Sequence, residues 1–112
     1  MRDLAIAVNV GSPASTLDLF KTTIKSYEQC LEGCDYCVFI GLGEKVSKPL
    51  RAFIENISLK QPQRYKIIFR GEQSYAQFLN LCFDQTQDFI FFAQSHDDVK
   101  LITSNFWQKF ML

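Results

Sequence analysis

The sequence has no excess of charge of either sign. Twelve Lys and Arg residues balance twelve Asp and Glu residues, so the formal net charge is zero at pH 7. A chain without a basic excess has no long-range attraction for a nucleic-acid backbone or for an anionic membrane surface. The composition therefore argues against a nucleic-acid partner, and we expect none.

Long apolar runs are also missing. No stretch approaches the roughly 18 to 20 residues that a membrane-spanning helix needs, and the short run after Arg2 and Asp3 is not the apolar segment of a signal peptide. Repeats, low-complexity segments and Pro-, Gly- or Ser-rich linkers are absent as well. We therefore expect a single domain over residues 1–112, with no transmembrane segment and in the cytoplasm.

Aromatic residues, by contrast, are plentiful. Eleven Phe, four Tyr and one Trp make up 14% of the chain. Hydrophobic residues account for 47% and charged residues for 21%, which is the composition of a folded globular chain and not of a disordered one. So many aromatic side chains are expected in a core or in an interface.

Apolar runs alternate with amphipathic stretches along the chain. The runs predict strands at residues 3–10, 36–40, 65–69 and 89–93. Apolar residues at helical spacing predict helices around residues 17–31, 50–57, 75–82 and 102–110. Ser12 or Ser15 is expected to cap the first helix and Gly33 to end it. Because parallel crossovers need room for a helix, this order predicts an α/β fold, a Rossmann-like three-layer α/β/α sandwich with about four parallel strands.

The sharpest polar cluster is His96, Asp97 and Asp98, directly after the fourth expected strand. Ligands of parallel sheets bind outside the carboxyl ends of the strands. Adjacent carboxylates repel each other unless a cation shares them, and Mg²⁺ or Mn²⁺ takes one or two carboxylates together with substrate phosphates. Two interpretations stay open: a divalent-metal site, or a cluster in which Asp97 or Asp98 caps the last helix. His96 is correspondingly either a base or metal ligand, or a hydrogen-bonded loop residue.

The cysteines are Cys30, Cys34, Cys37 and Cys82. Cys34 and Cys37 form a C-x-x-C pair, which both redox and zinc proteins use. The pair comes between a helix end and a strand, where no helix amino terminus lowers a thiol pKa, and the sequence has no second C-x-x-C pair for zinc. We therefore expect reduced thiols in the core, with a redox or zinc role as the alternative.

Familiar phosphate and nucleophile motifs are missing. The Gly41-Leu42-Gly43 segment begins like a dinucleotide fingerprint, but Val46 stands where the third glycine should be. The sequence contains no Walker A motif and no G-x-S-x-G nucleophile elbow. Arg64, Lys66 and Arg70, near the third expected strand, are either contacts for a ligand phosphate or part of a solvated charged loop.

The order of elements and the later motifs resemble the amino-terminal half of family 2 (GT-A fold) glycosyltransferases. The resemblance is most specific in Ser74-Tyr75-Ala76 with Asn80, in the apolar run from Asp88 to Ala93, and in Asp97-Asp98. In that family a strand ends in an Asp-x-Asp or Asp-Asp motif that holds a divalent metal and the donor's diphosphate. By this resemblance Asp97 lies near the donor ribose or the metal, and Asp98 is the stronger metal-ligand candidate.

The resemblance implies a donor site for a nucleotide-diphosphate sugar, with Mn²⁺ or Mg²⁺ as cofactor. It also implies the strand order 3-2-1-4, in which the first and fourth strands are neighbours, so that Val10, Gly11 and Ser12 lie beside Asp97. Glu44 stands in the place of an aspartate that contacts the base. Asn80 belongs to the family's third helix, and we expect it to take part in nucleotide-sugar binding as well.

The family's catalytic base and most contacts to the glycan or lipid acceptor come after the metal motif, in a second half that these 112 residues do not contain. The resemblance therefore implies donor binding without transfer by this chain alone, as a truncated GT-A fold, and it assigns no catalytic residue. The alternative is a non-catalytic α/β interaction module that self-associates through an aromatic surface. A last helix without its second half would leave Phe106, Trp107 and Phe110 partly uncovered, which favours a homodimer.

Overall fold

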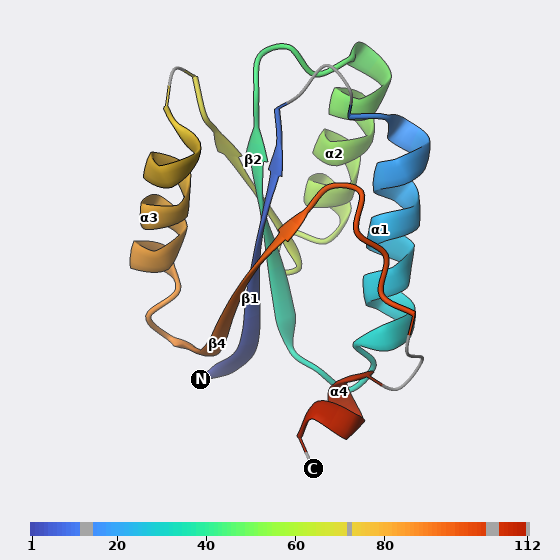
Figure 1. Cartoon of the computed structure of the whole chain (residues 1–112), viewed down its shortest axis with the longest axis vertical. Coiled ribbons are helices and arrows are strands. Elements are labelled where there is room, and N and C mark those ends of the chain that lie inside the picture. Colours follow the sequence, from blue (N-terminus) through green and yellow to red (C-terminus); the bar gives the residue numbers. More distant parts are fainter. Residues whose placement is uncertain (12–14, 72, 103–105, 112) are drawn as a thin grey trace.

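The computed structural model describes residues 1–11, 15–71, 73–102 and 106–111. Its elements, in chain order, are β1 (Arg2–Val10), α1 (Leu17–Cys30), β2 (Tyr36–Leu42), α2 (Lys48–Lys60), β3 (Tyr65–Phe69), α3 (Tyr75–Gln85), β4 (Phe89–His96) and α4 (Phe106–Phe110). The four strands form one parallel sheet in the order β3-β2-β1-β4. Helices α1 and α2 cover one face of the sheet and α3 the other (Figure 1). The Rossmann-like α/β class and the 3-2-1-4 order are thus confirmed.

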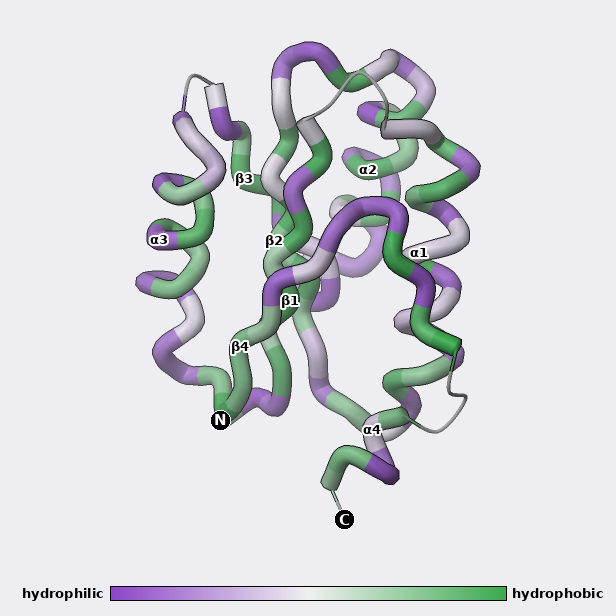
Figure 2. The backbone as a smooth tube through the Cα atoms, in the orientation of Figure 1, coloured by the Kyte–Doolittle hydropathy of each residue, from purple (hydrophilic) through white to green (hydrophobic). Residues whose placement is uncertain are grey.

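The two central strands are the most deeply buried part of the fold. All seven residues of β2 are buried, and β1 and β2 are mostly hydrophobic in Figure 2. Ile6 and Val8 of β1 point to the larger core, which α1 and α2 close, whereas Ala5 and Ala7 point to the smaller core under α3. The small side chains on that second face let α3 lie close to the sheet.

Hydroxyl caps set the starts of the helices. The Thr16 hydroxyl accepts from the Leu19 amide at 3.2 Å and caps α1. The prediction that Ser15 caps α1 was therefore wrong, because its hydroxyl donates to the Asp97 carboxylate instead; Ser12, the other candidate, lies outside the described residues. Helix α3 begins with a capping box, in which the side chains of Ser74 and Gln77 each accept from the other residue's amide.

Two strands extend further than their apolar runs. β2 continues to Leu42, so Gly41 lies inside the strand and does not end it. β4 continues to His96, because its pairing with β1 persists through the polar residues Gln94 and Ser95. The residues just after Ala93 are therefore part of the sheet and not of a loop.

The last helix is shorter than predicted. α4 spans Phe106–Phe110, and Ile102 lies outside it; residues 103–105 are outside the described part of the chain. Trp107 is buried against Phe91, with ring centroids 6.2 Å apart, so the expectation that it is partly uncovered was wrong. Phe106 and Phe110 do remain exposed. No helix in the described ranges is long and apolar enough to cross a bilayer.

All four cysteines are buried as free thiols, as expected. Burial raises the pKa of Cys34 and of Cys82 to about 12. Burial also raises the pKa of the Cys37 thiol, the partner of Cys34 in the C-x-x-C pair. A buried thiol with a raised pKa is a poor nucleophile at neutral pH, which favours a packing role for the pair over a reactive dithiol.

Candidate functional site

A cleft of about 360 Å³ opens at the carboxyl ends of β1 and β4. Its lining residues are Asn9, Gly11, Ser15, Tyr75, His96 and Asp97. Asn9 of β1 and His96 of β4 are paired in the sheet. The chain leaves β1 toward α1 on one face and reaches β4 from α3 on the other (Figure 1). The cleft therefore lies at the switch point, where open α/β sheets bind their ligands.

Two glycines let the backbones at this end of the sheet approach one another. The Gly43 amide donates to the Val10 carbonyl at 2.9 Å. A Cβ atom at Gly43 would lie only 2.8 Å from the Cα atom of Gly11, and one at Gly11 would lie 2.7 Å from Nη1 of Arg70. A larger residue at either position would displace a loop or the guanidinium, so the shape of the cleft depends on both glycines.

Arg70 follows β3 and reaches across to β1. Its Nη1 donates to Oδ1 of Asn9 at 2.7 Å, and its Nη2 donates to the Gln73 carbonyl at 2.9 Å. Its Nε is buried and has no hydrogen-bond partner among the described residues. A guanidinium held by two of its nitrogens, with a donor left over, is suited to an oxyanion such as phosphate.

Tyr75 contributes a second unused polar group. It is the first residue of α3, and its hydroxyl is buried without a hydrogen-bond partner in the described structure. Leaving such a group unpaired costs about 1–3 kcal/mol. A ligand or a water molecule in the cleft would remove that cost.

Asp97 is held at the opposite wall of the cleft by α1 and the turn before it. Its carboxylate accepts from the Ser15 hydroxyl, and its backbone carbonyl accepts from the Thr23 hydroxyl at 3.0 Å. The alternative in which Asp97 or Asp98 caps the last helix was wrong, because α4 begins only at Phe106. Asp97 is therefore a carboxylate held in place at the wall of the cleft.

The structure brings together only part of the residue set predicted from the sequence. Gly11 and Asp97 line the cleft. The Val10 side chain is buried in the core, while Glu44, Asn80 and Asp98 are exposed and are not among the lining residues. Ser12 lies outside the described residues.

Three lining residues, Asn9, Ser15 and Tyr75, were not among the predicted site residues. For Tyr75 a signal existed in the sequence. It opens the helix that follows the third strand, so it had to lie at the carboxyl end of a parallel sheet. The position of the Tyr75 hydroxyl, however, is set by packing against Phe78 with ring centroids 6.3 Å apart, which no local pattern specifies.

Asp97 and Asp98 do not make a complete metal site by themselves. In the described ranges no group of three or more His, Cys, Asp and Glu side chains is arranged to hold a metal ion. Mg²⁺ and Mn²⁺ are nevertheless often bound through one or two carboxylates when substrate phosphates and water complete the coordination. Two adjacent carboxylates would therefore need further ligands, such as phosphate or water oxygens, to complete a metal site.

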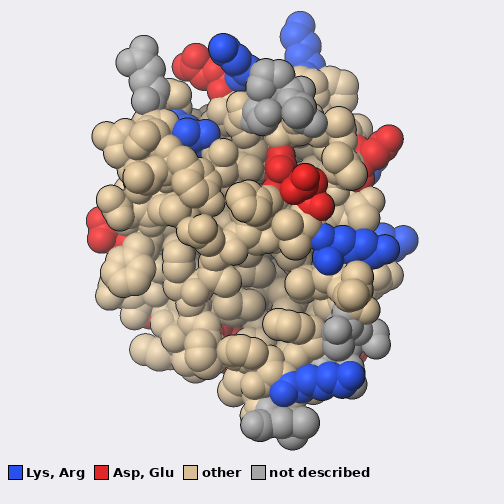
Figure 3. Space-filling view, viewed as in Figure 1, with Lys and Arg blue, Asp and Glu red and all other residues tan. Residues whose placement is uncertain are grey.

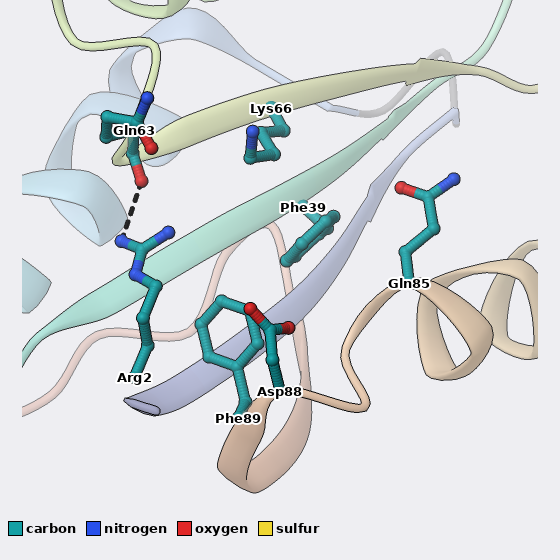
Figure 4. A pocket seen from close by; sticks show the side chains of 7 residues that line it. All are labelled: Arg2, Phe39, Gln63, Lys66, Gln85, Asp88 and Phe89. Atoms are coloured by element: carbon teal, nitrogen blue, oxygen red, sulfur yellow. Dashed lines mark hydrogen bonds between the residues drawn. The ribbon is translucent and has the colours of Figure 1, made fainter.

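A second hollow, of about 410 Å³, lies at the amino end of the sheet (Figure 4). Arg2, at its wall, donates to the Asp35 carboxylate at 3.1 Å and to the carbonyls of Tyr36 and Gln63 at 3.2 and 2.7 Å. The Arg2 guanidinium also lies 5.1 Å from the centre of the Phe89 ring. The hydrogen bonds of the Arg2 guanidinium are therefore already made within the protein.

The cationic residues near the third strand lie at two different ends of the sheet. Lys66 lines the amino-end hollow, and the guanidinium of Arg64 stacks 3.8 Å from the centre of the Tyr36 ring, also at the amino end of its strand. Arg70 alone of these three lies at the carboxyl end, against Gly11 and Asn9. Of these three cations, Arg70 alone therefore contacts residues that line the cleft, Asn9 and Gly11.

The chain matches no protein-family profile, no curated protein and no solved structure. The likeness to family 2 glycosyltransferases thus stays a prediction from sequence motifs.

Proposed function

We propose that this chain binds a nucleotide-diphosphate sugar in the cleft between β1 and β4. The observation that carries the proposal is the guanidinium of Arg70, which is fixed beside Gly11 while its buried Nε lacks a partner among the described residues. A diphosphate would supply the missing acceptor. Because Gly11 and Gly43 have no side chains, the phosphates could approach the backbone closely.

The opposite wall of the cleft supports a role for a divalent cation. Asp97 is a fixed carboxylate there, and Asp98 follows it in the exposed turn. Bound Mn²⁺ or Mg²⁺ would neutralise charge on the diphosphate, with Asp97 and Asp98 as its protein ligands. The cation and Arg70 would then act on the same phosphates from two sides.

Polar side chains in the cleft suit the sugar and ribose hydroxyls. The Tyr75 hydroxyl is unpaired in the described structure, and the side chains of Asn9 and His96 also line the space. These groups can donate to or accept from hydroxyls without a change of charge. The proposal covers donor binding only, since none of these groups is assigned as a catalytic base and the glycan or lipid acceptor is not identified.

The test is calorimetric titration of the chain with UDP, GDP and their sugars, with and without Mn²⁺. We expect binding at or below millimolar concentration with Mn²⁺, and binding about tenfold weaker without it. Asp97→Asn should weaken the Mn²⁺-dependent binding about tenfold. Asp88→Asn, the same change at the amino end of the sheet, should leave it unchanged.

Two results would contradict the proposal. One is the failure of every nucleotide to bind at millimolar concentration. The other is binding that persists unchanged in Asp97→Asn and in Asp98→Ala, because the acidic pair would then have no part in the site.

A further inference from the structure

One edge of the sheet is protected and the other is open. β3, at the first edge, has five residues, contains Lys66 and lies between Arg64 and Arg70. β4, at the second edge, has eight residues and contains no charged residue, no proline and no glycine. Natural edge strands are usually blunted by charge, proline, bulges or shortness, because unpaired N–H and C=O groups invite another strand. β4 contains no Lys, Arg, Asp or Glu and no proline, and it is not short.

Aromatic side chains stand exposed on both faces beside β4. Phe83 of α3 packs edge-on against Phe92 of β4 and is 56% exposed. On the other face Phe110 of α4 packs against Phe91 at 5.3 Å between ring centroids and is 52% exposed. Ile90, within β4, is also 52% exposed. The open edge is therefore flanked by apolar surface above and below the sheet.

Charged side chains avoid this side of the molecule. In Figure 3, Lys, Arg, Asp and Glu lie mainly around the margin, and the area over β4 and α3 is almost free of them. Apolar or neutral area of this kind, next to a strand edge, is typical of a protein interface.

We propose that the β4 edge pairs with the β4 edge of a second copy, in antiparallel orientation about a twofold axis. A twofold axis places each strand against its own reverse, so a charged side chain close to the axis would meet the same charge in the partner. The eight residues of β4 include no Asp, Glu, Lys or Arg, and the zero net charge of the chain adds no long-range repulsion between copies. The two four-stranded sheets would then form one continuous sheet.

Three exposed apolar side chains supply part of the area that such a dimer needs. Phe83, Ile90 and Phe110 are each about half exposed, which amounts to roughly 300 Å² per copy if a whole large side chain has roughly 200 Å². A standard interface buries about 800 Å² per partner. The strand backbone and the exposed residues Ala93, Gln94 and Phe106 would supply the remainder.

Acidic residues limit the paired segment. Asp88 precedes β4 and Asp97 follows it. In an antiparallel pair these carboxylates approach one another at the two ends of the interface. Added salt screens such repulsion, so the dimer should tighten as ionic strength rises.

Sedimentation equilibrium of the full chain over a range of concentrations tests the proposal. We expect a mass of twice the 13.0 kDa monomer at concentrations on the order of 100 µM. Ile90→Lys and Gln94→Lys place a positive charge on exposed β4 positions and should both give monomers with unchanged far-UV circular dichroism. Leu59→Lys, at an 82% exposed position on α2, makes the same chemical change elsewhere and should stay dimeric.

Hydrogen exchange gives a second readout that does not depend on mass. In the dimer the outward amides of β4 should exchange slowly, and they should become fast on dilution or in Gln94→Lys. A wild-type monomer at the highest concentration would overturn the proposal. A dimer that survives both lysine substitutions would overturn it too, because its interface would then lie elsewhere.

Discussion

The two ends of the sheet hold hollows of similar size but opposite character. At the amino end, the hollow of about 410 Å³ is bordered by Arg2, whose guanidinium is bound to a carboxylate and two carbonyls. At the carboxyl end, the cleft of about 360 Å³ is lined by Tyr75, and Arg70 lies behind its lining residues Asn9 and Gly11. Tyr75 and Arg70 each have a buried polar atom without a partner in the described structure. Volume therefore does not distinguish these two hollows, whereas their lining residues do: Tyr75 has a buried hydroxyl without a partner, and no residue that lines the amino-end hollow has such an atom in the described structure.

The amino end is also where buried ionisable groups gather. Cys34, Cys37 and Tyr36 lie around the start of β2, and Tyr65 opens β3. Burial raises the pKa of all four above the ordinary values of 9.0 for cysteine and 10.0 for tyrosine. The stability of this end thus depends on groups that stay protonated, whereas the carboxyl end has polar groups that could still bind a ligand.

The largest expected effect is alkaline unfolding that begins at the amino end. A group whose pKa is raised by folding contributes stability below its unfolded pKa, and loses that contribution as pH rises toward its folded pKa. Stability should therefore be level up to about pH 8 and then fall by about 1.4 kcal/mol per pH unit for each such thiol. Urea unfolding from about pH 7 to about pH 11 measures the slope.

Cys34→Ala is the matched variant for the alkaline slope. The pKa of Cys34 is raised to about 12, so its removal should flatten the slope between about pH 9 and about pH 12. The substitution also lowers stability at neutral pH through lost packing, but that loss does not depend on pH. An unchanged slope would show that the Cys34 thiol does not titrate differently in the folded and unfolded chains.

The second effect concerns the packing that shapes the carboxyl end. A Cβ at Gly41 would lie 2.7 Å from the ring of Phe78, which is fully buried under α3. Gly41→Ala should therefore lower the free energy of unfolding by about 1–3 kcal/mol through overpacking. Phe78→Leu should cost less in the Gly41→Ala background than in the wild type, a coupling that a double-mutant cycle measures. Additive costs would mean that the ring moves aside freely.

The fold was largely predictable because its signals are local. Apolar runs bounded by glycine mark β1, β2 and β3, and the stripe of Phe20, Ile24 and Tyr27 marks α1. The errors occurred where tertiary contacts decide between equivalent residues. Ser15 and Thr16 are equally good caps, and the contact of Ser15 with Asp97 leaves the role to Thr16. β4 runs on through polar residues because its end lies at an exposed edge, where pairing continues without burial.

The candidate site was less predictable because it joins residues that are distant in sequence. Asn9 and Arg70 are 61 positions apart yet lie 2.7 Å from each other at Oδ1 and Nη1. Conversely, Arg64 and Arg70 are near in sequence but lie at opposite ends of a strand that rises about 3.3 Å per residue. The resemblance to a metal-binding motif indicated Asp97 but gave no indication of Arg70, which contacts the lining residues Asn9 and Gly11.

The smallest effect on stability, and the most direct contrast between the two ends, comes from two arginine substitutions. Arg2→Ala removes hydrogen bonds to Asp35, Tyr36 and Gln63 and should lower the free energy of unfolding by about 1–2 kcal/mol. Arg70→Ala also removes the buried Nε that lacks a partner in the described structure, so its net cost should stay below about 1 kcal/mol.

Nucleotide binding should respond in the reverse order. Arg70→Ala should weaken binding of a nucleoside diphosphate about tenfold or more, whereas Arg2→Ala should leave it unchanged in the folded protein. Urea unfolding and calorimetric titration of the same two variants measure both quantities. If Arg2→Ala weakened binding and Arg70→Ala did not, the ligand would belong to the amino-end hollow. Arg70 would then have only a structural role, through its hydrogen bonds to Asn9 and Gln73.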